Sequence, residues 1–370
     1  MTFSIDKSNW RKVRFGDFAQ SVTDRVDDPS DAGVDRYVGL EHLDPGSLSI
    51  TRWGHPSDVE AQKLRFAPGD VIFGRRRAYQ RKVAQADFEG ICSAHALVLR
   101  AKPEFVLHKF LPVFLSSDYF LDRAIKISVG SLSPTVNWRD LAPQEFLLPP
   151  LSEQQRIADL LWGLHDHGQA LTKLRAQTEL VRRESIRTLC RPTGAPSVSI
   201  ADVADVLDNR RVPVSEAERA KRIGSVPYYG ATGQVGWIDE SIFNERLVLI
   251  GEDGAPFNEW RERPIAYEID GPSWVNNHAH VLRARSVSHQ WLLYSLMHFE
   301  IVPFVTGTTR GKLNLSSLRR IPILLPEDME HRAAKIAAVT SRISKIDDEL
   351  GSVRDLLSRA LDFLIGEDTI

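Results

Sequence analysis

Apolar residues recur at a regular spacing in two long stretches of the chain. In the second stretch, which follows Pro326, the steps between apolar positions alternate between three and four residues. The members of this series are Ile336, Val339, Ile343, Ile346, Leu350, Val353, Leu357, Ala360 and Leu364. A repeat of this length is typical of a coiled-coil seam, so it predicts a long helix that needs a partner helix.

The first stretch follows Pro149 and Pro150, which stop the element before them. Ser152 and Gln155 then form a capping-box start of the type Ser-x-x-Gln. Apolar residues follow at Ile157, Leu160, Leu161, Leu164, Leu171, Leu174, Val181 and Leu189. The pattern predicts a helix over 152–190, roughly 58 Å long at its rise per residue. We expect the two long helices to be each other's partners.

The segments before the two helices have a different character. Residues 1–150 and 192–326 are rich in glycine, proline and aromatic residues, and they contain short runs of β-type residues. These runs are Asp70-Val-Ile-Phe-Gly, Ala96-Leu-Val-Leu, Arg246-Leu-Val-Leu-Ile-Gly and His280-Val-Leu. Short apolar runs between turn residues predict two mixed α/β globules that contain much loop.

The two globules share short sequence similarities in the same order. The first globule has Phe73-Gly-Arg-Arg-Arg-Ala-Tyr, Ser93-Ala-His-Ala-Leu-Val-Leu-Arg-Ala, Val129-Gly-Ser-Leu-Ser-Pro-Thr-Val-Asn-Trp and Leu147-Leu-Pro-Pro. The second globule has Ile250-Gly-Glu-Asp-Gly-Ala, Asn277-His-Ala-His-Val-Leu-Arg-Ala, Thr306-Gly-Thr-Thr-Arg-Gly-Lys-Leu-Asn and Leu324-Leu-Pro. These ordered matches predict an internal repeat whose unit is one globule followed by one long helix.

Composition narrows the class of protein further. A length of 370 residues predicts two or three domains, and a hydrophobic fraction of 42% is enough to form cores. No run of about 18 apolar residues occurs, which argues against a membrane span. The N-terminal residues lack the apolar core of a signal peptide. Only Cys92 and Cys190 are present, far apart, which favours a reducing, cytoplasmic location over a disulfide framework or a zinc module.

Several of these motifs resemble those of one protein family, the specificity subunits of type I restriction–modification enzymes. The start of the first long helix, Pro149-Pro-Leu-Ser-Glu-Gln-Gln-Arg-Ile157, resembles the start of a conserved helix in that family. In the second globule, the segments that resemble a target recognition domain are Tyr228-Tyr-Gly-Ala-Thr-Gly-Gln-Val-Gly-Trp, Ile250-Gly-Glu-Asp-Gly-Ala and Trp274-Val-Asn-Asn-His-Ala-His-Val-Leu. In the first globule they are Phe73-Gly-Arg-Arg-Arg-Ala-Tyr-Gln-Arg-Lys and Gly130-Ser-Leu-Ser-Pro-Thr-Val-Asn-Trp.

The resemblance implies an α+β fold with two mixed α/β target recognition domains, separated by two long antiparallel coiled-coil helices. The expected boundaries are 1–150 for the first recognition domain, 151–191 for the first helix, 192–326 for the second recognition domain and 327–370 for the second helix. The second helix departs from the pattern, because it opens with Pro326-Glu-Asp-Met-Glu-His-Arg. Whether both helices dock partner subunits equally is therefore left open.

The resemblance also implies a function without catalysis by this chain. Each recognition domain would read one half of a bipartite target in double-stranded DNA. Two methyltransferase subunits would dock on the scaffold and methylate adenine N6, and a restriction endonuclease subunit, where one is present, would join for cleavage. An adaptor or inhibitor of a defence system, which keeps the scaffold but does not read DNA, is the alternative.

The formal net charge of −2 argues against a DNA-binding protein at first sight, but the charge is unevenly distributed. The segment from Lys63 to Lys82 holds seven basic residues and one acidic residue, a net charge of +6. Its candidates for phosphate or guanine contact are Arg75, Arg76, Arg77, Arg81 and Lys82, with Tyr79 and Gln80 for stacking or adenine contact. The alternative interpretation is a solvated basic loop.

Two further segments of the second globule are candidates for DNA contact. Gly307-Thr-Thr-Arg-Gly-Lys-Leu-Asn offers Thr308, Thr309, Arg310 and Lys312 to phosphates, or it serves to shape the backbone. The glycine-rich segment from Tyr229 offers Tyr229, Thr232 and Gln234 to base edges, or it is simply a hairpin turn.

Signatures of catalysis and of cofactor or metal binding are weak. No Asn/Asp-Pro-Pro-Tyr/Phe motif, Walker A loop or Gly-x-Ser-x-Gly elbow occurs, so we expect no catalytic residues and no cofactor. His278 and His280 lie two residues apart without a cysteine or carboxylate cluster in the sequence, so we interpret them as structural histidines. Glu252 and Asp253 are the best candidates for a nuclease centre, but we interpret them as part of a polar loop.

Overall fold

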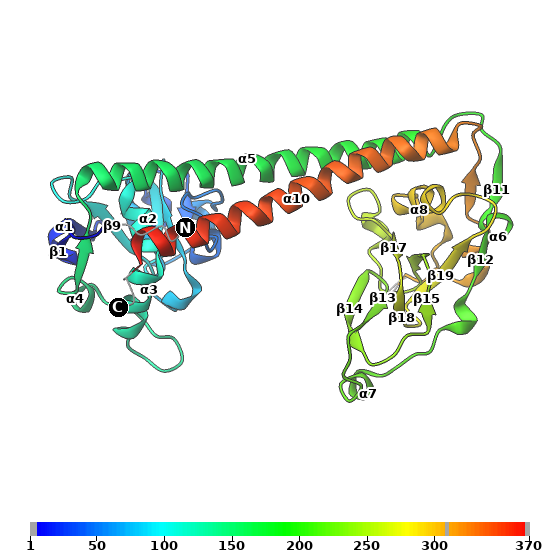
Figure 1. The fold of residues 1–370 in the computed structure, drawn as a ribbon, viewed down its shortest axis with the longest axis horizontal. Helices are drawn as coiled ribbons and strands as arrows, with labels where there is room; N and C mark the ends of the chain where they lie inside the picture. Colours follow the sequence, from blue (N-terminus) through cyan, green and yellow to red (C-terminus); the bar gives the residue numbers. More distant parts are fainter. Residues whose placement is uncertain (1–5, 308–310, 367–370) are drawn as a thin grey trace. The chain divides into compact units, whose positions relative to one another are not determined.

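The computed structural model describes residues 6–307 and 311–366. The chain divides into two compact units, one made of Met1–Thr172 with Asp348–Ile370 and the other of Lys173–Asp347. Each unit holds one globule and one end of each long helix, α5 (Leu151–Leu189) and α10 (Met329–Ile365) (Figure 1). Among the described residues, no helix is both long enough and apolar enough to cross a membrane.

The first globule is built around two four-stranded sheets. The antiparallel sheet has the order β2 (Ala19–Val22), β9 (Leu97–Ala101), β6 (Val71–Phe73) and β7 (Val83–Gln85). The mixed sheet has the order β3 (Arg25–Val26), β5 (Lys63–Phe66), β8 (Gly90–Cys92) and β4 (Tyr37–Val38). A short pair joins the start and the end of this globule, β1 (Arg11–Arg14) with β10 (Glu145–Leu148). The helices are α1 (Phe15–Phe18), α2 (Phe110–Ser116), α3 (Asp118–Lys126) and α4 (Trp138–Leu141).

Aromatic side chains fill the core of the first globule. Phe114 and Phe146 meet edge to face with ring centroids 5.3 Å apart, an arrangement that adds to the free energy gained from burial alone. Ser117 caps α3, because its hydroxyl accepts a hydrogen bond from the amide of Phe120. The core therefore fixes α2 and α3 against the sheet that carries the basic segment.

The second globule repeats the plan of the first. Its antiparallel sheet has the order β12 (Ala204–Val206), β19 (Ala279–Ala284), β16 (Leu247–Gly251) and β17 (Ala266–Ile269). Its other sheet has the order β14 (Gly233–Ile238), β13 (Val226–Gly230), β18 (Pro272–Val275) and β15 (Phe243–Asn244). A closing pair is again present, β11 (Ser197–Ser199) with β20 (Pro322–Leu324). The helices are α6 (Ile200–Val203), α7 (Glu216–Arg219), α8 (His289–Met297) and α9 (Leu315–Leu318).

The strand orders confirm the internal repeat. The order β2-β9-β6-β7 in the first globule corresponds to β12-β19-β16-β17 in the second. The β-type runs of the sequence become the central strands β6, β9, β16 and β19, whose apolar residues are buried. Continuous apolar runs are typical of strands that are covered on both faces.

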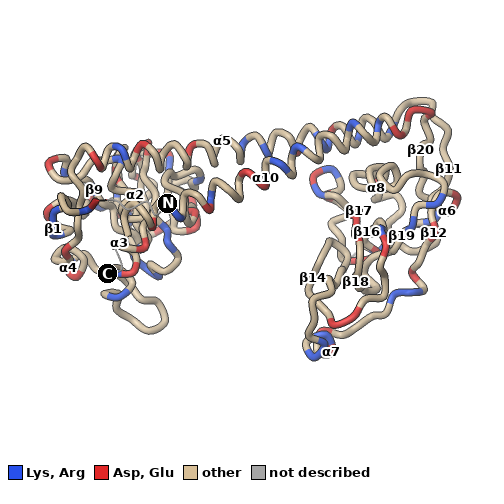
Figure 2. Tube along the Cα trace, viewed as in Figure 1, with Lys and Arg blue, Asp and Glu red and all other residues tan. Residues whose placement is uncertain are grey.

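The helix α5 begins and ends within one residue of the predicted limits 152–190, and α10 begins two residues after the expected start at position 327. In the first unit they lie side by side, since Gly168 of α5 faces Val353 of α10 and His167 contacts Glu349 at 3.0 Å. In the second unit Arg175 of α5 forms an ion pair with Asp347 of α10 at 2.5 Å. The predicted seam of α10 faces inward, but Leu160, Leu174 and Val181 of α5 are exposed. Charges of both signs line these helices (Figure 2).

Candidate nucleic-acid interface

The basic segment of the first globule forms the turn between β6 and β7. Arg75, Arg76 and Arg77 follow β6, and the amide of Gly74 donates to the carbonyl of Lys82 at 2.8 Å, which closes the turn. Arg77 and Arg81 adopt the left-handed conformation, with φ of 58° and 56°. Such a conformation is uncommon for a residue with a Cβ and costs of order 1–3 kcal/mol per residue.

A second loop, residues 129–135, holds this basic turn. Its ends pair through backbone hydrogen bonds between Val129 and Thr135, at 3.0 and 2.9 Å. The amide of Arg77 donates to the carbonyl of Pro134 at 2.7 Å, and Ser133 Oγ accepts from Arg76 Nη2 and Arg77 Nε, each at 3.2 Å. Two motifs that lie far apart in the sequence therefore form one surface.

The other basic residues between positions 63 and 82 do not join this surface as free charges. Lys63 is buried and donates to backbone carbonyls, while Arg65 donates to the carbonyl of Ala32 at 2.5 Å. Arg81 forms an ion pair with Asp118, and Lys82 Nζ donates to the carbonyl of Leu40 at 2.6 Å. The exposed members of the predicted set that form no ion pair among the described residues are Arg76, Arg77 and Tyr79, with Arg75 and Gln80 half-buried beside them.

The glycine-rich segment of the second globule is a hairpin between β13 and β14. Thr232 lies in its two-residue turn, and Thr232 and Gln234 are exposed. Tyr229 is half-buried, with its ring against Tyr267, so it supports the hairpin rather than extending from it. Of the three predicted contacts in this segment, only Thr232 and Gln234 are available on the surface.

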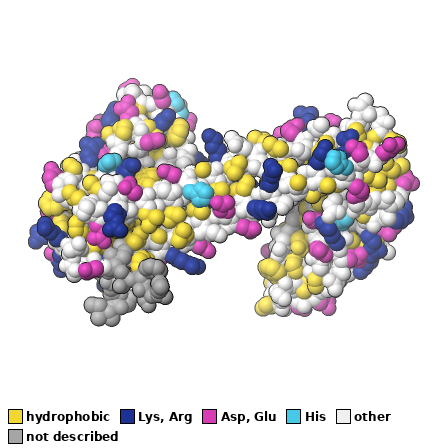
Figure 3. Space-filling model, turned by 45° about the horizontal axis from the view of Figure 1, so that its top comes forward, with side chains coloured by type: hydrophobic (Ala, Val, Ile, Leu, Met, Phe, Trp, Pro, Cys, Tyr) yellow, Lys and Arg dark blue, Asp and Glu magenta, His cyan; other side chains and the backbone are white. Residues whose placement is uncertain are grey.

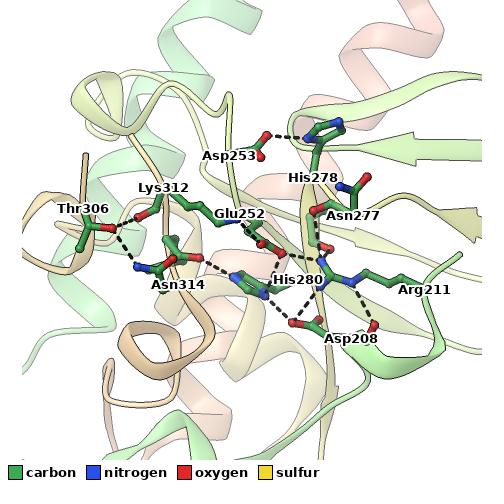
Figure 4. A network of polar contacts seen from close by, with 12 residues as sticks. Asp208, Arg211, Glu252, Asp253, Asn277, His278, His280, Thr306, Lys312 and Asn314 are labelled. Carbon is green, nitrogen blue, oxygen red and sulfur yellow. Dashed lines mark hydrogen bonds and ion pairs between the residues drawn. The ribbon is translucent and has the colours of Figure 1, made fainter. Parts of the chain in front are cut away.

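Lys312 lies at the end of the second predicted loop, whereas Thr308, Thr309 and Arg310 lie outside the described residues. The backbone of Lys312 pairs with Thr306 through hydrogen bonds of 2.8 and 2.7 Å, as Thr135 pairs with Val129 in the first globule. Lys312 Nζ forms an ion pair with Glu252 Oε1 at 3.1 Å. Figure 4 shows this lysine reaching toward Glu252 from the neighbouring loop.

Behind Lys312 lies a buried polar network that the sequence alone did not reveal (Figure 4). His280 is fully buried, and its Nδ1 contacts Asp208 Oδ2 at 2.5 Å while its Nε2 donates to the carbonyl of Leu313 at 2.7 Å. Arg211 Nη1 contacts Glu252 Oε2 at 2.8 Å and the carbonyl of Ala279 at 2.7 Å.

Asp208 illustrates the electrostatic balance of this network. Burial raises the pKa of Asp208, but hydrogen bonds from His280 and the amide of Val281, together with the nearby charge of Arg211, hold it below its usual range. The carboxylate therefore stays charged and is compensated inside the globule. No local pattern around Asp208 or Arg211 distinguishes them from ordinary surface residues in the sequence, which is why they were not predicted.

Asp208, Glu252 and His280 have ligand atoms close enough together to bind a metal ion. Both oxygens of Glu252 face cations, however, because Arg211 contacts one and Lys312 the other. The nitrogen of His280 that faces the two carboxylates is Nδ1, and it contacts Asp208 Oδ2 at 2.5 Å, the distance of a direct hydrogen bond. The arrangement fits an ion-pair network that fastens strand β16 to the loop at Lys312. Asp253, the other nuclease candidate, contacts His278 at 2.5 Å.

Relatives with similar sequences are specificity subunits. A protein of Haemophilus influenzae, provisionally named a type I restriction enzyme specificity subunit, is 32% identical over 126 residues, which is 34% of this chain and 31% of that protein. The chain spans about a third of the length of the curated relatives that it matches.

Solved structures share the fold along nearly the whole chain. A chain from a structure of the assembly and conformational transition of the type I restriction–modification system has a TM-score of 0.58 at 21% identity, covering 97% of this chain and 98% of that one. The S subunit of a type I restriction–modification system from M. genitalium has a TM-score of 0.60 at 16% identity, covering 98% and 97%. These likenesses show the fold, with two globules and two long helices.

One protein family matches the sequence itself over most of its length. Its description is type I restriction modification DNA specificity domain, and it matches twice, over residues 7–181 and 192–350. Each match covers one globule and most or part of the helix that follows it, which is the repeat unit found in the sequence and in the strand order. The chain therefore belongs to the type I restriction modification DNA specificity family and carries two copies of its domain.

Proposed function

We propose that the protein is the DNA-specificity subunit of a type I restriction–modification system, in which each globule reads one half of a bipartite target in double-stranded DNA. The observation that carries this proposal is the repetition of one DNA specificity domain on one strand order, with polar loops at the same place in both copies. A target with two separate halves requires two DNA-recognition domains, and this chain carries two copies of one such domain.

The surface of the first globule supports DNA binding. Among the described residues, neither Arg76 nor Arg77 forms an ion pair, and both side chains are exposed. Guanidinium groups in this state can neutralise phosphates and can bind guanine O6 and N7 with two hydrogen bonds. Tyr79 adds an exposed aromatic ring beside them.

The long helices carry apolar side chains that neither unit covers, and these support docking of two methyltransferase subunits. In the first unit Leu160, Leu356 and Phe363 are exposed, and in the second unit Leu174, Leu180 and Val181 are exposed. Hydrophobic side chains lie among charged ones on the helix surface in Figure 3. Exposed apolar side chains on these helices supply surface that a protein partner can bury. A restriction subunit would join the same complex.

We further propose that this chain performs no chemistry itself and acts in the cytoplasm, with its methyltransferase partners supplying adenine N6 methylation. The carboxylates that could serve a nuclease, Glu252 and Asp253, are engaged by Arg211, Lys312 and His278. A centre for metal-dependent hydrolysis needs carboxylates that are open to a metal and to water.

Mapping of N6-methyladenine across the genome, with and without this gene, tests the proposal. We expect one split motif to lose methylation when the gene is deleted and to regain it on complementation. Unchanged methylation would contradict the proposal and favour an adaptor that no longer reads DNA.

Exchange of residues 1–150 with those of a related subunit tests the assignment of one half-site to each globule. We expect one half of the methylated motif to change while the other half is kept. A change in both halves would contradict the assignment.

A further inference from the structure

The loop 129–135 of the first globule is a built feature rather than a free connection. Its two ends are closed by the Val129–Thr135 pair, and Gly130 adopts a φ of 113°, which favours glycine at that position. Thr135 also bridges to Arg76, and the amide of Val136 donates to the carbonyl of Arg75 at 2.9 Å. Backbone hydrogen bonds therefore join the loop to the basic turn.

The tip of this loop presents a hydrophobic side chain to solvent. Leu132 is 91% exposed, and its neighbour in the chain, Ser133, is the residue whose hydroxyl accepts from both guanidinium groups. An exposed leucine alone is ordinary. This leucine lies in a loop that contacts Arg76 and Arg77, neither of which forms an ion pair among the described residues. Four backbone hydrogen bonds fix the loop, two within it and two to the basic turn.

Backbone strain independently marks the same place. Among the described residues, Ala61, Arg77 and Arg81 are the non-glycine residues with positive φ, and two of the three flank the turn that faces this loop. Strain of this kind persists where the surrounding structure fixes it, and it gathers at sites that bind ligands.

We propose that loop 129–135 and the Arg76–Arg77 pair form one element that enters a groove of the DNA, in which Leu132 makes an apolar contact with a base. Ser133 is a positioning residue, because it orients both guanidinium groups beside Leu132. This inference rests on the proposed function and names the residues through which the first globule discriminates its half-site.

The chemistry of DNA fits this arrangement. Arginine reads guanine through paired hydrogen bonds, and an apolar side chain contacts the thymine methyl group in the major groove. Cations beside an apolar tip fit a surface of phosphates around base edges better than they fit a protein surface, where two unpaired guanidinium groups would need carboxylate partners.

Binding measurements on the complex of the full chain with its methyltransferase subunits test the proposal. The probes are a duplex with the motif found by methylation mapping and a duplex with one scrambled half-site. We expect Leu132→Ser to weaken binding of the first duplex about tenfold, which is the range of one base contact, without changing the salt dependence. Leu132→Met keeps an apolar side chain and should stay within about twofold of the original protein.

Ile223→Ser is the matched control, because Ile223 is 89% exposed and lies in the second globule. It should leave discrimination at the first half-site unchanged. Ser133→Ala should reduce discrimination at that same half-site while the salt dependence stays constant, because both arginine charges remain.

The outcomes separate this inference from the proposed function. If the original protein binds both duplexes equally, the proposed function fails. If it discriminates and Leu132→Ser discriminates equally well, only this inference fails. Equal weakening on both duplexes, or failure of the complex to assemble with Leu132→Ser, would also overturn the inference, since Leu132 would then serve general affinity or a protein contact.

Discussion

The two globules place opposite charges at the same point of one fold. In the first globule, Arg76 bridges to Thr135 of the loop 129–135. In the second, Asp253 bridges to Lys312 of the corresponding loop, and Thr306 takes the place of Val129. The exit of the central strand therefore carries arginines in one copy and carboxylates in the other.

This difference changes how each loop is fastened. In the first globule the side-chain link is the neutral hydroxyl of Ser133, so the charges of Arg76 and Arg77 remain available. In the second globule the link is the Lys312–Glu252 ion pair, so the lysine charge is compensated on site. One backbone plan therefore holds unpaired arginines in the first copy and an ion-paired lysine in the second, and the proposed reading of two different half-sites needs such a difference.

The largest effect is expected in the buried network around His280, which the second globule has and the first lacks at the equivalent strand position. His280 of strand β19 pairs with Ile250, and the equivalent pair in the first globule joins Leu97 with Phe73. We expect His280→Leu to destabilise the second unit by about 3 kcal/mol, because the buried Asp208 loses its main partner. Hydrogen exchange resolved by segment would report the two units separately.

Leu97→Met is the control in the first globule, where no buried charge depends on this position. It should cost less than about 1.5 kcal/mol, because the substitution keeps an apolar side chain of similar volume. Equal costs in both units would mean that the network of the second globule adds nothing to its stability.

The salt dependence of DNA binding should also differ between variants of the two globules. Each uncompensated cation that meets a phosphate contributes about 0.9 to the slope of log affinity against log salt concentration. We therefore expect Arg76→Ala to reduce this slope by close to that amount and to weaken binding about tenfold at moderate salt. Lys312→Ala should change the slope by clearly less, because Glu252 already compensates its charge.

Titration of the complex with its cognate duplex at several salt concentrations measures both slopes. Arg65→Ala is a third variant. Arg65 is basic, but it donates to the carbonyl of Ala32 and does not join the DNA-facing surface as a free charge. If Lys312→Ala reduces the slope as strongly as Arg76→Ala, the Lys312–Glu252 pair does not persist on DNA.

Backbone strain in the basic turn gives a smaller effect with an opposite sign for stability and binding. Arg77 has a φ of 58°, a conformation that glycine adopts without a Cβ penalty. Arg77→Gly should therefore stabilise the first unit by about 1 kcal/mol while weakening DNA binding. Arg76→Gly is the matched control, because Arg76 lacks a positive φ and should gain no stability. A gain from both variants would mean that strain is not the cause.

The sequence predicted the elements that depend on local periodicity and missed those that depend on distant contacts. The helix at Leu151–Leu189 and the central strands follow from spacing and apolar runs. That Arg76 meets Ser133 could not be predicted, because the contact spans 57 positions and is made by the fold.

The same limit explains the exposed leucines of α5 and the buried network. Leu160 and Leu174 are apolar like the seam residues, and only the position of the partner helix decides which apolar residues face inward. Asp208 and Arg211 are charged like surface residues, and only their mutual pairing allows their burial.

Acidification should lower the stability of the second unit more than that of the first. The effect of each single carboxylate is the smallest that we expect. Carboxylates whose pKa is lowered by partners are concentrated in the second unit, at Asp202, Asp208, Asp239, Glu245, Glu268 and Asp328. The pKa of Glu268 is lowered to about 2, chiefly by the hydrogen bond from His289 and further by Arg246, against the opposing effect of burial.

A carboxylate with a lowered pKa in the folded state stabilises that state above its ordinary pKa, and the contribution is lost as pH falls. For Glu268 the loss runs from about pH 4.5 down to about pH 2. Glu268→Gln cannot titrate, so its stability should depend less steeply on pH than that of the original protein in this window, as followed by hydrogen exchange in β17. Glu240→Gln is the control, because Glu240 is exposed and pairs with Arg222 rather than with a residue of β17, so the profile of β17 should stay unchanged. Identical profiles for Glu268→Gln and the original protein would show that the ion pairs of Glu268 do not cause the acid sensitivity of this sheet.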